Sequence, residues 1–306
     1  MIDGERQKGN LKFSKLLLKY VFNTRFFIFR LTKRSRLVKK IADKFLFEDN
    51  ELFILPNKSA VNKTKRLPNK SAVNKTKRDT ITTSIEINQS LQKDESEFVP
   101  SEIIKEVIKE ANDIFIMHSC FCRSSSDCQD YPQDFGCIFL GPASRKISSK
   151  YGRPASVEDA LEHVDMADSL GLSHLIGRNK IDSIFLNAGP KEELLTICHC
   201  CPCCCLWKII PDLDDDISNK VKRLDYVEVH AFNDNCKLCK KCLADDVCFG
   251  NAISLENGKI TINQDKCLGC GHCVQACKFD AIELNYTQKS VDSILNRIGE
   301  LVDYKK

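Results

Sequence analysis

Eight cysteines in the last third of the sequence are spaced like the ligands of iron–sulfur clusters. The first run is Cys236-x2-Cys239-x2-Cys242-x5-Cys248, and the second is Cys267-x2-Cys270-x2-Cys273-x3-Cys277. Three thiolates with two residues between them can surround one face of a cubane cluster, and the fourth cysteine of each run then reaches the other cluster. Zinc knuckles use paired CxxC units and fit this pattern less well. The sequence therefore predicts two [4Fe–4S] clusters, which carry single electrons.

Ten further cysteines precede these runs, at spacings that no single motif explains. They are Cys120, Cys122, Cys128, Cys137, Cys198, Cys200, Cys201, Cys203, Cys204 and Cys205. Three interpretations are open: a third iron–sulfur cluster, which we favour, a structural zinc site that could use His199, and a redox-active thiol site. We expect a subset of the ten to bind metal. Arg123 could offset the negative charge of such a centre.

The local sequence predicts how these sulfur atoms are presented. The segments CFC at 120–122 and CHC at 198–200 are expected to be extended, which places two sulfur atoms on one side of each. Pro202 favours the start of a helix, with residues 203–205 in a first turn where the helix dipole stabilises thiolates. We expect this helix to end at Pro211.

The elements around the cysteines can be placed from hydrophobic periodicity and capping residues. A helix is expected from Pro100, a strand at 114–117, and a second helix that Ser156 caps, with Asp159 in the capping-box position. An amphipathic helix from Ser290 is expected to pack on its own chain.

Residues 227–286 read as two similar halves, each with a strand, a cysteine loop, a short helix and a returning strand. Asn257 and Gly258 are expected to turn a hairpin between them. With its cysteine spacing, this segment resembles the bacterial two-cluster ferredoxin domain. The resemblance assigns one cluster to Cys236, Cys239, Cys242 and Cys277, and the other to Cys248, Cys267, Cys270 and Cys273.

The sequence departs from that family at two points. Five residues separate Cys242 from Cys248, where the family usually has three, and Phe249 and Lys278 stand where a proline commonly follows the fourth cysteine. Both clusters can still form, because the longer gap follows the three-cysteine segment. Their potentials are expected to differ from those of a free ferredoxin.

A second resemblance covers about residues 98–286. The segments FCR, DCQDYPQDFGCIFLG, EDALEHVDMADSLGLSHLIGRNK and ICHCCPCCC are similar to those of uncharacterised iron–sulfur proteins from anaerobes and archaea. In that family a cysteine-rich domain precedes a two-cluster ferredoxin domain, and an asparagine usually stands at the position of His199. The resemblance implies the architecture and the cofactors, and it implies no substrate.

Charge is distributed unevenly along the chain. Residues 1–78 contain 21 Lys/Arg and 6 Asp/Glu, which leaves 25 Lys/Arg and 36 Asp/Glu for the rest. Residues 11–47 alternate apolar and basic residues and lack the run of about 20 apolar residues that a spanning helix needs. They predict a basic amphipathic helix that packs on the acidic body, with binding to an anionic membrane surface as the alternative.

A perfect tandem repeat follows the basic segment. Residues 55–66 read LPNKSAVNKTKR, and residues 67–78 repeat them without a change. Such polar sequence cannot bury enough apolar surface to order itself, so residues 55–96 are expected to form a largely disordered linker. Its lysines have no interleaved aromatic residues, so nucleic acid is not expected as a partner. Dinucleotide-binding and P-loop motifs are absent.

These features predict an α+β chain of five parts: a basic helical segment (1–54), a linker (55–96), a cysteine-rich metal-binding domain (97–226), a two-cluster ferredoxin domain (227–286) and a C-terminal helix (287–306). Metal-ligand spacing without a visible signal peptide predicts a cytoplasmic protein, with the membrane surface as the peripheral alternative. We expect an electron-transfer protein with a redox partner protein. The alternatives are a ferredoxin-fed reductase, an iron–sulfur oxidoreductase with its catalytic cluster in 97–226, and a non-enzymatic redox-responsive adaptor.

Overall fold

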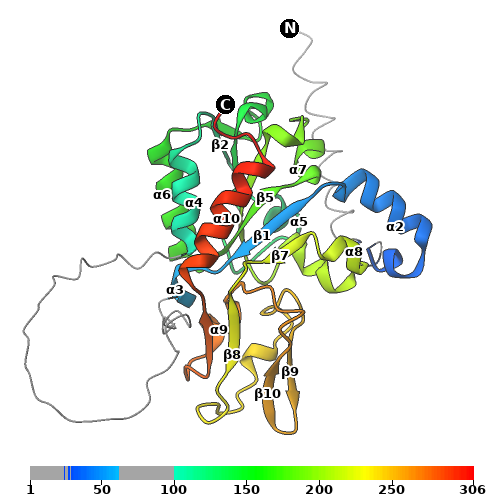
Figure 1. The fold of residues 1–306 in the computed structure, drawn as a ribbon, viewed down its shortest axis with the longest axis vertical. Helices are drawn as coiled ribbons and strands as arrows, with labels where there is room; N and C mark the ends of the chain where they lie inside the picture. Colours follow the sequence, from blue (N-terminus) through cyan, green and yellow to red (C-terminus); the bar gives the residue numbers. More distant parts are fainter. Residues whose placement is uncertain (1–23, 25–26, 28, 62–99) are drawn as a thin grey trace, which may run out of the picture.

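Seven short strands form one mixed sheet, and two two-stranded sheets lie below it in Figure 1. The computed structural model describes residues 24, 27, 29–61 and 100–306. The large sheet has the order β4-β2-β3-β6-β5-β1-β7, and only β1 and β7 are parallel neighbours. Its strands are β1 (Glu51–Leu55), β2 (Ile114–Met117), β3 (Ile138–Leu140), β4 (Gly152–Pro154), β5 (Ser173–Arg178), β6 (Leu195–Cys200) and β7 (Val221–Arg223). The mixture of helices and strands confirms the α+β class.

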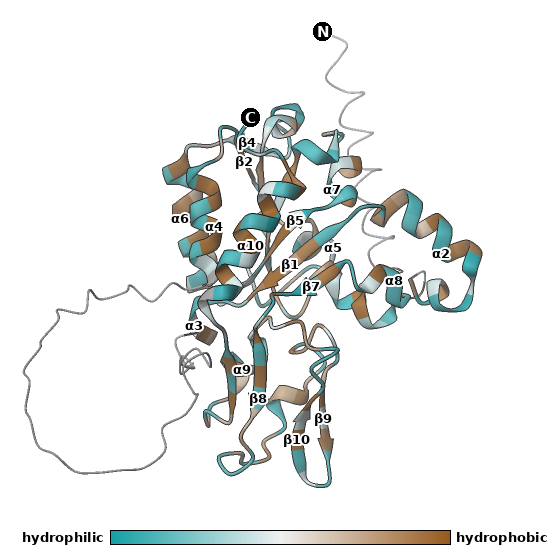
Figure 2. Cartoon of the chain, viewed as in Figure 1, coloured by the Kyte–Doolittle hydropathy of each residue, from teal (hydrophilic) through white to brown (hydrophobic). Residues whose placement is uncertain are grey.

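Three helices cover one face of this sheet: α4 (Pro100–Lys109), α6 (Val157–Ser169) and α10 (Gln288–Leu301). Each carries hydrophobic and hydrophilic residues along its length (Figure 2), as expected for a helix that buries one side. The predicted capping box is present, since Ser156 Oγ accepts from the N–H of Asp159 at 3.1 Å. Helix α10 packs on its own chain as predicted, and Val291 and Ile298 are buried in the core.

The opposite face is covered by shorter elements from four parts of the chain. They are the π-helical turn η1 (Asp43–Phe47), α5 (Phe121–Ser125), η3 (Pro142–Lys146), α7 (Lys180–Phe185), η4 (Lys191–Glu193), η5 (Leu206–Asp212) and α8 (Asp215–Ser218). Helix α2 (Arg36–Ala42) leads into η1 and buries no residue. Strand alternation sends Cys198 and Cys200 to this face, while Ile197 faces α4 and α6.

The described part of the basic segment packs on the acidic body, which is the first of the two interpretations given for residues 11–47. Arg30 Nε lies 2.8 Å from Asp212 Oδ1, and Lys39 Nζ lies 2.6 Å from Asp214 Oδ1. Phe29 belongs to the apolar cluster that covers the Cys200 side of the large sheet. Residues 11–23 lie outside the described residues, so the membrane alternative stays a prediction. No helix among the described residues combines the length and apolar character needed to cross a bilayer.

The predicted boundary between the basic segment and the linker is wrong. Strand β1 runs through it, pairs with β5 and β7, and is followed by the short helix α3 (Lys58–Val61). The physical reason is that the first repeat copy continues an apolar strand: Leu52, Ile54 and Leu55 are at most 2% exposed. The rest of the predicted linker, from residue 62, lies outside the described residues.

Asn57, in the first repeat copy, joins the two halves of the molecule. Its buried Nδ2 donates to the backbone carbonyls of Asp168 (3.0 Å) and Leu172 (2.9 Å). Its Oδ1 accepts from Gln275 Nε2 in the ferredoxin domain at 3.0 Å. Nearby, a Cβ on Gly271 would lie 2.6 Å from Ala60 Cβ, so only glycine fits the close approach of the two parts.

Replacing Asn57 with alanine is expected to lower the free energy of unfolding by about 2–4 kcal/mol, because two buried carbonyls lose their donor. Chemical denaturation of the full chain measures the change. The exposed Asn296→Ala on α10 is the matched control and should stay within about 0.5 kcal/mol. Equal values for the two variants would contradict the structural role of Asn57.

The ferredoxin-like domain follows the predicted order of elements. Strand β8 (Glu228–Ala231) pairs with β11 (Ile282–Asn285), and β9 (Ile253–Glu256) pairs with β10 (Lys259–Ile262). Asn257 and Gly258 turn the hairpin with φ of 50° and 75°, a geometry that favours this residue pair. The two short helices of the halves are η6 (Lys241–Leu243) and α9 (His272–Ala276).

Candidate metal centres

The eight C-terminal cysteines lie in the ferredoxin-like domain, and their assignment to two clusters stays a prediction. Cys236, Cys239, Cys242 and Cys277 line one small cavity. In the other set, Cys273 interacts electrostatically with Cys248, Cys267 and Cys270. Burial raises the pKa of both Cys270 and Cys273, since a thiolate without a metal is poorly solvated there.

Backbone N–H groups point at sulfur atoms in both sets. Cys236 Sγ accepts from the N–H of Leu238 at 3.4 Å, and Cys277 Sγ accepts from the N–H of Ala281 at 3.3 Å. In the second set, Ala252 donates to Cys248 Sγ at 3.2 Å, directly after the lengthened loop. Such bonds stabilise negative charge on sulfur and tune the potential of a bound cluster.

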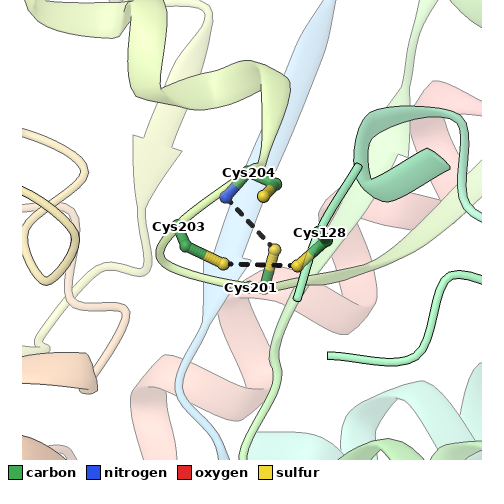
Figure 3. Close-up of side chains that lie close together, drawn as sticks. All are labelled: Cys128, Cys201, Cys203 and Cys204. Carbon is green, nitrogen blue, oxygen red and sulfur yellow. Dashed lines mark hydrogen bonds between the residues drawn. The ribbon is translucent and has the colours of Figure 1, made fainter. Parts of the chain in front are cut away.

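The ten upstream cysteines divide into two groups. Four of them form what we call the compact group: Cys128, Cys201, Cys203 and Cys204. Their sulfur atoms all lie within 4.8 Å of one another (Figure 3), and Cys128 Sγ is 3.6 Å from Cys203 Sγ. Four thiolates that bind one ion at about 2.3 Å lie about 3.8 Å apart, so this group suits a single tetrahedral ion. The hydrogen bond with Cys203 lowers the pKa of Cys201 to about 6.

The other six form the cavity group: Cys120, Cys122, Cys137, Cys198, Cys200 and Cys205. Their thiols make a continuous series of contacts, in which Cys137 Sγ lies 3.5 Å from Cys198 Sγ. Cys120 interacts with both Cys122 and Cys137, and Cys205 interacts with both Cys122 and Cys200. They line a cavity of about 200 Å³ whose other walls are mostly apolar.

Arg123 lies buried between the two groups, with 1% of its surface exposed. Its guanidinium donates to the carbonyls of Pro132 (2.8 Å), His199 (2.9 Å) and Phe135. All three partners are neutral, so the charge of Arg123 is available to the thiols on either side. Hydrogen bonds from two neighbouring thiols, helped by this charge, lower the pKa of Cys120.

Two local predictions about these cysteines are wrong. The 120–122 segment is not extended: Cys120 is the N-cap of helix α5. The predicted helix after Pro202 starts only at Leu206, is a 3₁₀-helix, and contains Pro211. Residues 203–204 form a turn instead, because Cys205 and Trp207 are both buried toward the cavity while the turn supplies the compact group. The 198–200 segment is extended as predicted.

His199 lies outside the compact group and on the opposite side of β6 from Cys198 and Cys200. Its Nδ1 is 2.9 Å from His174 Nδ1, and His174 Nε2 is 3.1 Å from Asp168 Oδ1. If Asp168 accepts from His174 Nε2–H, then His174 Nδ1 accepts from His199, and His199 Nε2 is a buried acceptor without a partner. The zinc interpretation therefore does not need His199.

The second ferredoxin set lies beside the cavity group. Cys270 shares one apolar cluster with Cys200 and Cys205. His272 Nε2 is 3.0 Å from Ser173 Oγ, which in turn lies 3.3 Å from the Cys200 carbonyl. Burial lowers the pKa of His272 to about 4, so its ring is neutral. Sequence reasoning missed His272 and Ser173, because no motif marks residues that meet only in the tertiary structure.

Comparison with known proteins identifies only the C-terminal part of the chain. Residues 260–283 match the 4Fe-4S binding domain family. An uncharacterized protein of Methanocaldococcus jannaschii is 50% identical over 42 residues, which are 14% of this chain and 11% of that protein. The electron transport protein HydN of Escherichia coli K12 is 37% identical over 49 residues, 16% of this chain and 28% of the relative.

A third relative, an uncharacterized ferredoxin of M. jannaschii, is 40% identical over 47 residues, 15% of this chain and 28% of its own. The chain thus spans less than a third of the length of these three relatives. No solved structure matches it significantly.

Proposed function

We propose that this chain, which carries a 4Fe–4S ferredoxin domain in its C-terminal part, is an electron-transfer protein that links a redox partner to a buried cysteine-rich centre. The ferredoxin domain and the electron transport relatives support the iron–sulfur and electron-transfer part. Two observations support the rest: Cys270 belongs to the same apolar cluster as Cys200 and Cys205, and His272 is linked through Ser173 to the Cys200 carbonyl.

Two [4Fe–4S] clusters occupy the domain in this proposal. The outer cluster is held by Cys236, Cys239, Cys242 and Cys277. The inner cluster is held by Cys248, Cys267, Cys270 and Cys273. The gathering of each set in the fold supports this assignment.

The outer cluster faces the partner. Cys239 is exposed, and the neighbouring Leu238 and Phe279 are 45% and 43% exposed. The exposed Lys237, Lys240 and Lys241 line the same small cavity. An apolar centre with a rim of lysines fits a partner with an acidic docking surface. Electrons then pass to the inner cluster and on toward Cys200.

The compact group binds one metal ion in this scheme, iron or zinc. Its four sulfur atoms lie within 4.8 Å of one another, which supports a single ion, because a cubane would hold its thiolates further apart on separate iron atoms.

Anaerobic reconstitution of the full chain with iron and sulfide tests the two clusters. The domain should bind about eight iron atoms, and dithionite reduction should give the EPR spectrum of two interacting clusters. Cys239→Ser and Cys270→Ser should each remove one cluster and leave the uncoupled signal of the other. A reconstituted protein without any cubane-type signal would refute the proposal.

A further inference from the structure

We infer that the cavity group binds a polynuclear iron–sulfur cluster of its own, separate from the ion of the compact group. The chain would then carry two metal centres upstream of its ferredoxin domain. The binding itself does not depend on the proposed function; only its position at the end of an electron path does.

The cavity group contains more thiols than a single ion can bind. Six sulfur atoms converge from separate segments: the start of α5, the residue before β3, the end of β6 and the residue before η5. One tetrahedral ion takes at most four thiolates, so six in continuous contact exceed what a single zinc or iron ion can use. Several metal atoms bridged by sulfide can use them all.

The cavity beside these thiols is large enough for a cluster. Protein cores pack at the density of organic crystals and leave few voids larger than one water molecule. The cavity beside these thiols, at about 200 Å³, is much larger than a single ion requires. Phe139, Trp207 and Phe29 wall it with apolar surface, and each is at most 9% exposed. Six cysteines with a purely structural role would have no reason to surround such a void.

Arg123 provides the positive charge that a buried cluster needs. A thiolate-bound cluster is an anion, and burying an anion is costly without a nearby positive charge. Arg123 supplies that charge from inside the wall of the cavity, and three backbone carbonyls fix its orientation. Among the described residues no carboxylate forms an ion pair with Arg123, as expected if a cluster is its counter-ion.

The two upstream groups are separate sites. Their sulfur atoms form two sets without a shared member, and Cys201 of the compact group also lines the cavity next to Cys200, so the two sites are neighbours. The compact group lies partly at the surface, where Cys203 and Cys204 are half-buried, whereas the cavity is lined by buried residues that include Phe29 of the N-terminal segment. A site shielded from water favours an oxygen-sensitive cluster with a tuned potential.

Metal and acid-labile sulfide analysis of the full chain tests the inference, after anaerobic reconstitution with ferrous iron and sulfide and removal of excess. The wild type should bind about twelve iron atoms or more, against about eight for the ferredoxin domain alone. Cys120→Ser/Cys137→Ser should lose about four iron atoms with a similar amount of sulfide. The matched variant Cys128→Ser/Cys203→Ser should lose about one metal ion and no sulfide.

The EPR signals of the ferredoxin clusters report whether each variant is folded and whether the proposed function holds. Nine or fewer iron atoms in a wild type that shows both ferredoxin signals would overturn the inference without touching that function. So would mass spectrometry that finds the six cavity cysteines paired in disulfides in the anaerobic wild type. A cavity variant that keeps the wild-type iron and sulfide would overturn it as well.

Discussion

Replacing Arg123 with methionine is expected to lower the free energy of unfolding by about 3–5 kcal/mol and to prevent metal binding by the cavity group. Methionine fills much of the same volume, but three buried carbonyls lose their donor, including those of Pro132 and His199. The positive charge beside Cys120 also disappears, which disfavours the thiolates that bind metal. Denaturant unfolding and iron analysis of the full chain measure the two effects.

Two control variants separate these causes. Arg123→Lys keeps the charge but cannot reproduce the fork of three hydrogen bonds, so it should lose stability while retaining more metal than the methionine variant. Arg145→Met removes an exposed arginine paired with Asp113 and should leave the iron content unchanged. If Arg123→Met binds as much iron as the wild type, the charge of Arg123 has no part in the site.

A chain that begins at residue 62 is expected not to fold. It lacks β1, and β1 provides the partner for both β5 and β7 in the large sheet. It also lacks Asn57, which joins the ferredoxin domain to the sheet, and Phe29, which lines the cavity. Far-UV circular dichroism and thermal unfolding should show no cooperative transition, and the protein should be insoluble without a solubility tag.

The matched control is a chain that lacks residues 67–78, one copy of the repeat. It keeps β1 and a complete LPNKSAV segment from Leu55 onward, so its melting temperature should equal that of the full chain. A cooperative transition in the chain that starts at residue 62 would show that β1 is dispensable.

The ferredoxin domain could be predicted in detail, because its chemistry depends on local spacing. The three cysteines of each CxxCxxC run are spaced to surround one face of a cluster, and Asn257 with Gly258 turns a hairpin by backbone conformation alone. The extended CHC segment of β6 was equally readable, since strand alternation fixes which side chains share a face.

The division of the ten upstream cysteines could not be predicted. Cys128 and Cys137 lie in loops, and the fold sends the first to the compact group and the second to the cavity group. Consecutive residues, Cys200 and Cys201, end in different sites. This division depends on how α5, η5 and the N-terminal segment pack on the sheet. The spacing of cysteines in the sequence does not predict that packing.

Strand β1 was missed for a different reason. Its five residues are too few for a periodic pattern, and they lie between a basic helix and a polar repeat. The apolar run from Leu52 to Leu55 was the available signal, although nothing in it indicated a place between two other strands.

The two repeat copies are identical in sequence, and the first copy includes Asn57 and the last residue of β1. Deleting either copy from the gene gives the same protein, so replication slippage that shortens this stretch by twelve residues leaves β1 and Asn57 in place. A point mutation of Asn57 has no such protection. Asn69 in the second copy cannot replace it without moving the strand, because Lys65 and Arg66 precede that copy where Phe53 and Ile54 precede the first. We therefore expect the loss of one twelve-residue copy to be tolerated better than a substitution at Asn57.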